Sequence, residues 1–184
     1  MLTSITEIRK YFFARSLRQQ QQRLNVERTS MNLQQAKLVG ILFNGTALEQ
    51  RQLVMKYVSK LEKQGKKITL LGFIDQPKPL ENLTFPHYSR QEINWKLEPQ
   101  SLEVSTFMEQ NIDVLLVLDI NSNVQFEYIS TLSKAKFRVG PFTGNVDAYD
   151  LMIDTNQTSS LADFIQEIEQ YLQKTTTLHE QSTI

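Results

Sequence analysis

The sequence predicts an α/β domain of three layers, Rossmann-like or flavodoxin-like, with a mostly parallel sheet of about five strands preceded by a long N-terminal helix. Apolar runs of strand length recur at 37–43, 67–73 and 113–120. Segments with helical spacing of apolar residues separate these runs, so strands and helices alternate along the chain. The chain has 184 residues, 40% of them hydrophobic, which is enough for one hydrophobic core.

The N-terminal arm, residues 1–36, differs from the rest of the chain in charge. From Met1 to Lys37 the chain carries seven basic and two acidic side chains, a charge of +5, although the whole chain has 20 of each. The remainder therefore carries −5, and no Lys or Arg occurs in 97–133 or 139–173. Helical spacing predicts one helix from about Ser4 to Glu27. This helix either packs by one stripe on the domain or offers a basic surface to anionic lipid, RNA or an acidic partner.

The first strand–helix–strand unit follows the arm. The run 37–43 is bounded by Asn44 and Gly45, as expected of a buried strand. Thr46 and Glu49 have the spacing of a capping box, which predicts the start of a helix that Gly65 ends. The second strand is predicted at 67–73.

The stretch from 76 to 91 is irregular and contains three prolines, so it is long for a connection inside a compact domain. It is either a functional loop or a loop that hides a short edge strand. The segment 92–96 is the best candidate for a brief third strand. Ser101 then caps a helix whose predicted buried residues are Leu102, Val104, Phe107 and Met108.

The strongest strand pattern is 113–120, and a capping box of Ser122 and Gln125 predicts the helix after it. Short strands are predicted at 136–139 and 151–153, and Ser160 caps a last helix. The α/β domain is predicted to span residues 37–173. Residues 174–184, rich in Thr and Gln, are predicted to form a flexible tail.

Polar residues stand where the predicted strands end, and parallel α/β sheets bind ligands at that edge. The chain has neither the G-x-G-x-x-G fingerprint nor a P-loop, so a turn or a helix cap also explains each residue without a ligand. No catalytic residue is assigned. The candidate ligand-binding residues are Asn44, Gly45 and Thr46 after the first strand, Asp75 after the second, and Asp119, Asn121 and Ser122 after the central one.

Composition excludes several chemistries. The chain has no cysteine and two histidines, so we expect no disulfide, no thiolate chemistry, no metal site and no cofactor. The balanced total charge argues against general nucleic-acid binding. We expect no transmembrane segment, because no run approaches the ~20 apolar residues that such a helix needs. No signal peptide is evident either, so a cytoplasmic location is the default expectation.

Segments spread along the chain resemble a known family. The basic leading helix together with LVGILFNGT, KITLLGF, INW, DVLLVLDI and YISTLSKAKFRVGPF resembles a Bacteroidetes family of small proteins that carry a domain of unknown function. This resemblance implies no activity and no site residue.

The segment DVLLVLDINSN followed by STLSKAKFRVGPF is similar to part of one half of heptosyltransferase-like glycosyltransferases. Those enzymes hold a nucleotide sugar between two Rossmann-like halves and place an acidic catalytic residue in their first loop. This chain has room for one half, and its first loop reads Asn44-Gly45-Thr46. The resemblance therefore implies a related fold without the activity. The matching positions are Asp119, Ser133, Ala135, Arg138 and Gly140.

Two hypotheses on function result. In the first, the chain is a non-catalytic, cytoplasmic α/β domain for binding or interaction, whose basic arm contacts a protein partner or a second copy. In the second, it binds a nucleotide or nucleotide sugar at the carboxyl ends of its strands. The sequence leaves open whether the protein is an enzyme.

Overall fold

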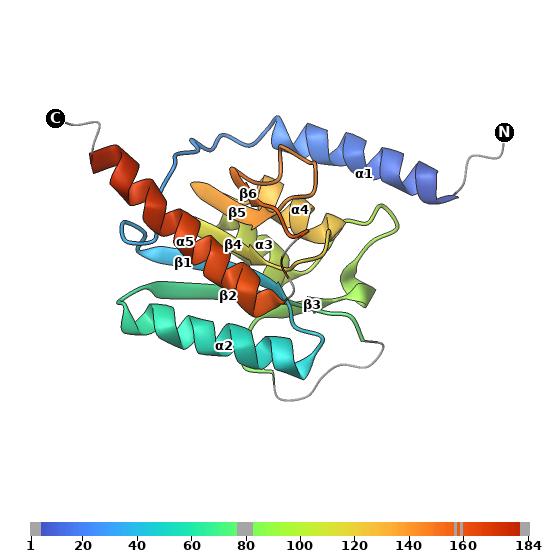
Figure 1. Cartoon of the computed structure of the whole chain (residues 1–184). Helices are drawn as coiled ribbons and strands as arrows, with labels where there is room; N and C mark the ends of the chain where they lie inside the picture. Colours follow the sequence, from blue (N-terminus) through green and yellow to red (C-terminus); the bar gives the residue numbers. More distant parts are fainter. Residues whose placement is uncertain (1–4, 77–82, 157, 159, 181–184) are drawn as a thin grey trace.

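The computed structural model describes residues 5–76, 83–156, 158 and 160–180. The fold class is confirmed, with six strands rather than about five in one all-parallel sheet of order β3-β2-β1-β4-β5-β6 (Figure 1). The strands are β1 (Leu38–Asn44), β2 (Lys67–Ile74), β3 (His87–Ser89), β4 (Val114–Leu118), β5 (Phe137–Pro141) and β6 (Leu151–Ile153). The helices are α1 (Ile5–Gln21), α2 (Leu48–Lys63), α3 (Leu102–Glu109), α4 (Val124–Leu132) and α5 (Leu161–Glu180), with a short 3-10 helix η1 (Arg90–Glu92).

Each face of the sheet has its own apolar core. On one face, β1 and β4 pack against α2 and α5. On the other face, the strands pack against α3 and α4, and α1 lies outside α4 (Figure 1). The central strands are buried on both sides, since all five residues of β4 are buried, which explains their continuous apolar sequence. None of the described helices is long and apolar enough to span a membrane.

The arm packs on its own domain. The helix α1 ends at Gln21, six residues before the predicted end at Glu27, and the chain from residue 25 to 31 is irregular. Leu17 is buried, the ring of Phe13 lies 5.9 Å from that of Tyr128 on α4, and the Tyr128 hydroxyl donates to Gln20 Oε1 at 3.0 Å. One side of α1 therefore extends the core that α3 and α4 form.

Arg28 anchors the chain after α1 to the end of α4. Its guanidinium donates to the carbonyl of Ala135, to Ser133 O at 3.0 Å and to Thr131 O at 3.3 Å. Burial lowers the pKa of Arg28 to about 10, with repulsion from Arg138 as a second cause. The guanidinium thus satisfies carbonyls at a helix C-terminus, where the helix dipole favours a positive charge. The arm is held here by backbone carbonyls and not by carboxylates of the acidic half.

The position of the predicted third strand is corrected. The segment 92–96 is no strand, because Ile93 forms only an isolated antiparallel bridge with Pro99, and Trp95 is 55% exposed. The third strand is instead His87–Ser89, so the alternative that the stretch from 76 to 91 hides a short edge strand is confirmed. It pairs with β2 alone, and three residues at a sheet edge leave almost no periodic signal. The helix α5 continues to Glu180, beyond residue 173, where the α/β domain was predicted to end. Residues 181–184 lie outside the described chain.

Predicted buried faces are mostly confirmed, with exceptions at helix ends. Val104 and Phe107 of α3 are buried, whereas Leu102 at its first position is 77% exposed. Ser101 caps this helix as predicted, because its Oγ accepts from the Val104 amide at 3.2 Å. Gly65 ends α2 as predicted, with a φ of +79° that favours glycine.

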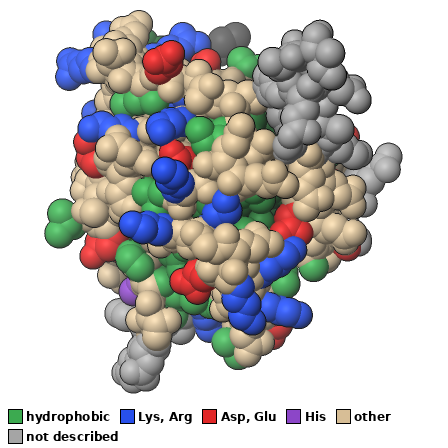
Figure 2. Space-filling view, turned by 90° about the vertical axis from the view of Figure 1, so that its left-hand side faces the viewer, with side chains coloured by type: hydrophobic (Ala, Val, Ile, Leu, Met, Phe, Trp, Pro, Cys, Tyr) green, Lys and Arg blue, Asp and Glu red, His purple; other side chains and the backbone are tan. Residues whose placement is uncertain are grey.

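The amino ends of the strands form a basic edge (Figure 2). Lys37 and Lys67 stand next to each other at the starts of β1 and β2, and Lys136 precedes β5. Asp113 lies among them and accepts hydrogen bonds from the Lys37 and Leu38 amides and from Lys136 Nζ, at 2.9–3.0 Å. Burial opposes ionisation of this carboxyl, but the three hydrogen bonds outweigh it and lower its pKa to about 2.

Candidate functional site

The strand order places a topological switch point between β1 and β4. The chain proceeds outward from β1 to β2 and β3 on one side, and from β4 to β5 and β6 on the other. Loops that follow neighbouring strands at such a point diverge to opposite faces and leave a crevice at the carboxyl edge of the sheet. Asn44 is the last residue of β1, and the other six predicted site residues follow β1, β2 or β4 on this edge.

The loop after β1 is tied down by its own polar groups. Asn44 Oδ1 accepts from the Thr46 amide at 3.0 Å, and Thr46 Oγ1 accepts from the Asp75 amide at 2.9 Å. Arg51 of α2 donates to the carbonyls of Gly45 and Thr46 at 2.6 and 2.9 Å. The predicted capping box is wrong, because Ala47 is the N-cap of α2 and provides no side-chain hydrogen bond. The Thr46 hydroxyl joins the β1 loop to the end of β2 instead.

Phe85 closes the space beside this loop on the α2 face. Its ring lies 5.1 Å from the ring of Phe43, and a Cβ added to Gly72 would stand 2.5 Å from Phe85. A Cβ on Gly45 would stand 3.1 Å from Ile74 and 3.5 Å from Phe85. Gly45, one of the predicted ligand-binding residues, is thus packed against apolar side chains. Phe85 thus occupies this half of the expected crevice.

The loop after β4 is also bound internally. Asp119 is 4% exposed, its Oδ1 accepts from the Asn121 amide at 3.0 Å, and burial raises its pKa. The predicted capping box is wrong here as well. Asn123 is the N-cap of α4 and accepts from the Gln125 and Phe126 amides, whereas the Ser122 hydroxyl donates to Glu127 Oε1 at 3.3 Å.

An open crevice lies on the other face of the carboxyl edge and has a volume of about 510 Å³. We call it the edge crevice. It brings together the end of β2, η1 and the loop after it, the start of α4, and one arginine of α1. It is lined by Arg9, Phe73, Asp75, Arg90, Ile93, Leu97, Ser122, Asn123, Val124 and Gln125.

An ion pair and a docked arginine define the charge of the edge crevice. Arg90 donates to Asp75 Oδ2 at 2.7 Å, and this pair separates the edge crevice from a neighbouring hollow of about 490 Å³. Arg9 Nε donates to the carbonyl of Trp95 at 2.7 Å, and the ring of Trp95 lies 5.4 Å from that of Phe12. With Asp75 neutralised by Arg90, Arg9 contributes the remaining positive charge.

Of the seven predicted residues, Asp75 and Ser122 line the edge crevice, and Asn44, Gly45, Thr46, Asp119 and Asn121 do not. Sequence reasoning missed Arg9, Arg90, Asn123 and Gln125. The surplus of basic residues in the arm indicated that residues such as Arg9 could have a role. No sequence pattern linked Arg9 to the other lining residues, which are more than 60 positions away. Asn123 offers a capping side chain one residue after Ser122, and only the backbone decides between the two.

The residues that line the edge crevice can recognise a ligand by charge and by hydrogen bonding. The described lining residues include one carboxylate, which is ion-paired, and no His, Lys, Cys or Tyr. His87 lies elsewhere, with Nδ1 3.2 Å from the carbonyl of Phe85. Within the described residues, no three His, Cys, Asp or Glu side chains cluster as metal ligands.

Comparison with known proteins identifies a family. A family model described as a family of unknown function (DUF6913) matches residues 9–175, from the first half of α1 into α5. No curated protein matches the chain, and no solved structure matches it.

Proposed function

This chain belongs to the DUF6913 family of unknown function, and we propose that it is a non-catalytic binding domain that holds a small anionic ligand in the edge crevice. The observation that carries the proposal is the position of Arg9, which the docked arm brings to a crevice at the carboxyl edge of the sheet. Cytoplasmic location is part of the same proposal.

The lining favours a ligand with an anionic group and a mixed body. Arg9 and Arg90 face one carboxylate, so a phosphate or carboxylate meets a net positive charge. Ser122 and Gln125 offer hydrogen bonds to a polar body, and Phe73 and Ile93 offer apolar contact. The volume of about 510 Å³ is in the usual range of small-molecule sites. Nucleotides and nucleotide sugars have this combination of groups, and the resemblance to one half of a glycosyltransferase suggests the same class.

The residues also favour binding over catalysis. Asp75 is held by Arg90 and is therefore a poor general base, and Asp119 is buried outside the crevice. The lining offers no described histidine to transfer a proton and no activated nucleophile.

The test is a thermal-shift panel on the full chain with nucleoside mono- and diphosphates, nucleotide sugars, sugar phosphates and inorganic phosphate. A ligand at about 100 times its dissociation constant stabilises the folded state by roughly 2.7 kcal/mol, which raises Tm by roughly 5–11 °C. Isothermal titration then gives the affinity of the hit. If no compound in the panel raises Tm, the proposal is wrong.

Two variants of α1 locate the site. Arg9→Gln removes the charge that lines the edge crevice and is expected to weaken the hit by about tenfold or more. Arg15→Gln removes a charge from an exposed position on the same helix and is expected to leave the affinity unchanged. Equal weakening by both variants would assign the effect to the total charge of the helix and contradict the assignment of Arg9.

A second candidate function uses the outer face of α1. Ile5, Ile8 and Tyr11 are 78%, 41% and 61% exposed although they are apolar or aromatic, which is typical of a contact surface. Residues 97–173 carry twelve acidic and three basic side chains, so a second copy offers charge complementary to the arm. Sedimentation at increasing concentration tests this, and an Ile8→Asp/Tyr11→Asp variant is expected to stay monomeric where the natural chain associates. A natural chain that is monomeric throughout would contradict self-association.

A further inference from the structure

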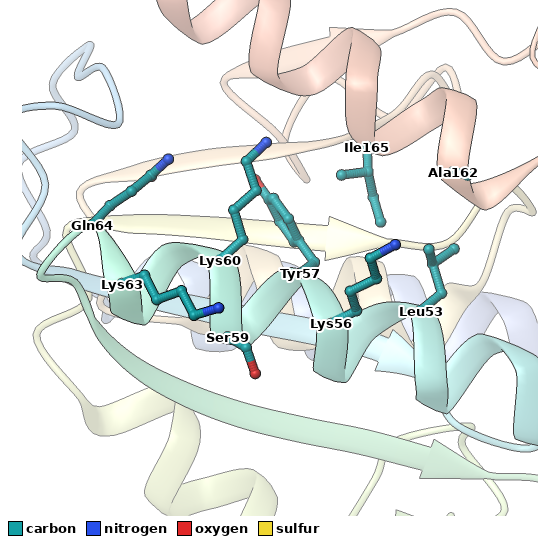
Figure 3. Close-up of a pocket in the computed structure, with 9 residues that line it drawn as sticks. All are labelled: Leu53, Lys56, Tyr57, Ser59, Lys60, Lys63, Gln64, Ala162 and Ile165. Carbon is teal, nitrogen blue, oxygen red and sulfur yellow. The ribbon is translucent and has the colours of Figure 1, made fainter.

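A second cavity lies on the opposite face of the sheet, between α2 and α5, and has a volume of about 610 Å³ (Figure 3). We call it the helix groove. Among the described helices, α2 and α5 are the ones that cover this face, since the described residues of the β2–β3 and β5–β6 connections contribute no helix to it. The helix groove is lined by Leu53, Lys56, Tyr57, Ser59, Lys60, Lys63, Gln64, Ala162 and Ile165.

The helix groove has an apolar part and a cationic rim. Leu53 and Ile165 face each other across it, and Lys56 and Lys60 extend from α2 toward α5 (Figure 3). Lys60 Nζ is bound by both carboxylate oxygens of Glu169, at 2.6 and 2.7 Å. Lys56 and Lys63 have no acidic partner among the described residues. The rim therefore carries two positive charges that no described carboxylate neutralises.

Tyr57 provides an independent observation. Its side chain rises from α2 toward α5 with the hydroxyl at its far end (Figure 3), and the residue is 5% exposed. The buried hydroxyl oxygen has no hydrogen-bond partner in the described part of the chain. A buried hydroxyl without a partner costs about 1–3 kcal/mol, so an otherwise well-packed protein rarely retains one. A ligand atom in the helix groove would satisfy this hydroxyl.

An ordinary structural role accounts for only part of this arrangement. Lysine stems cover apolar surface, and Lys60 and Lys63 lie in the last turn of α2, where positive charge is favourable. These effects explain why lysines are tolerated here. They do not explain an open volume beside apolar side chains, or a buried hydroxyl that points into the layer between the helices.

We propose that the helix groove binds an amphipathic anion, a molecule with an apolar chain or ring system and one carboxylate or phosphate group. Its apolar part would lie against Leu53 and Ile165, and its head would meet Lys56 and Lys63. The volume is typical of small-molecule sites, which favours such a molecule over a protein helix. This site is separate from the edge crevice and does not depend on it.

The test uses isothermal titration of the full chain with dodecanoate below its micellar concentration. Dodecan-1-ol and dodecylammonium have the same chain with no charge and with a positive charge. Dodecanoate is expected to bind at one site, more tightly than the alcohol and far more tightly than the cation. If no binding is detected at dodecanoate concentrations up to about 1 mM, or if the ammonium compound binds equally well, the proposal is wrong.

Three variants connect the binding to this place in the fold. Lys56→Gln/Lys63→Gln is expected to weaken dodecanoate by about tenfold and to leave the alcohol unchanged. Ala162→Trp fills the groove from an exposed position on α5 and is expected to abolish binding of both. The matched control Lys10→Gln/Lys96→Gln removes two charges outside the helix groove and is expected to change neither affinity. A control that weakens dodecanoate as strongly as Lys56→Gln/Lys63→Gln would overturn the assignment.

The variant Tyr57→Phe tests whether the Tyr57 hydroxyl binds the ligand or has only a structural role. Removing a buried hydroxyl without a partner is expected to leave stability unchanged or raised, while dodecanoate binds at least threefold more weakly. Unchanged affinity would remove Tyr57 from the argument and contradict the proposed pose.

Vesicles of phosphatidylglycerol distinguish a free amphiphile from a membrane lipid as the source of the anion. Binding of dodecanoate without co-sedimentation assigns the helix groove to a free molecule. Co-sedimentation that Ala162→Trp removes assigns it to a lipid. Co-sedimentation that persists in Ala162→Trp, with no binding of dodecanoate, would place the interaction on another surface and overturn the proposal.

Discussion

Asp113 allows a quantitative test of how much the contacts at the basic edge contribute to stability. Its carboxylate accepts hydrogen bonds from two backbone amides at the start of β1 and from Lys136 Nζ, and its side chain is 15% exposed. These contacts join β1, β4 and β5 at their amino ends, because the Asp113 amide also donates to Leu38 O and its carbonyl accepts from Phe137. The sequence placed Asp113 inside the predicted central strand, and the structure gives it this role in the sheet.

The magnitude follows from its pKa. The folded value of about 2 against an ordinary value of 3.8 corresponds to about 2 kcal/mol of stability. Because the folded pKa is lowered, this contribution is complete above about pH 5 and is lost as the pH falls toward 2. Asp113→Asn is therefore expected to lower the free energy of unfolding by about 2 kcal/mol at pH 7 and to differ little from the natural chain at pH 2.

Urea denaturation of both chains at several pH values measures this difference. Glu109→Gln is the matched control, because it removes the carboxylate of an ion pair with Lys134 whose acidic side chain is 68% exposed, and the expected change is within ~0.5 kcal/mol. If the stability difference between the natural chain and Asp113→Asn stays constant from pH 6 to pH 2.5, the linkage argument is refuted.

Three further predictions concern the helix cap, the core and the anchoring of the arm. Asn123→Ala is expected to destabilise the fold by about 1 kcal/mol and Ser122→Ala by less than half of that, as measured by urea denaturation. The reverse order would restore Ser122 as the cap. Gly140→Ala places a Cβ 2.5 Å from the ring of Tyr149, so a loss of about 1–3 kcal/mol is expected, reduced in a double variant with Tyr149→Ala if the clash is the cause. Arg28→Gln is expected to cost about 2 kcal/mol, seen as a fall in Tm of roughly 4–8 °C and as faster hydrogen exchange in α1. Unchanged exchange in α1 would show that Arg28 does not hold the arm.

The sheet was predictable because each buried strand has its own local signature. A parallel strand covered on both faces needs a continuous apolar run, and β1, β2 and β4 all show one. The edge strand β3 was predicted only as one alternative for the stretch from 76 to 91 and without bounds, because three residues paired on one side need no such run. The predictions of helix caps at Thr46 and Ser122 were wrong for a related reason. A capping motif shows which side chain can cap a helix, whereas the path of the neighbouring strand decides which residue does.

The sequence predicted the location of the candidate site but not most of the residues that line it. The carboxyl edge follows from strand order, and Asp75 and Ser122 lie in the edge crevice there. Asn44, Thr46 and Asp119 accept hydrogen bonds from backbone amides. Asn121 donates to Asp119, and Gly45 lies against Phe85. Whether these residues are open to a ligand depends on a packing that no local pattern encodes. The helix groove was not predicted, because its lining comes from two helices that are distant in sequence.

The sequence by itself determined the order of strands and helices, the burial of the central sheet and the uneven distribution of charge. The charge distribution is a matter of composition alone. The order and the burial depend on residues within one turn or one strand of each other, where hydrophobic periodicity and backbone preference act directly. The tertiary structure alone decided where the basic arm lies. Arg9 reaches a carbonyl 86 residues away and Arg28 one 107 residues away. Such contacts form only after the domain has brought unsatisfied carbonyls to its surface, and they turn a positive segment into one wall of a crevice.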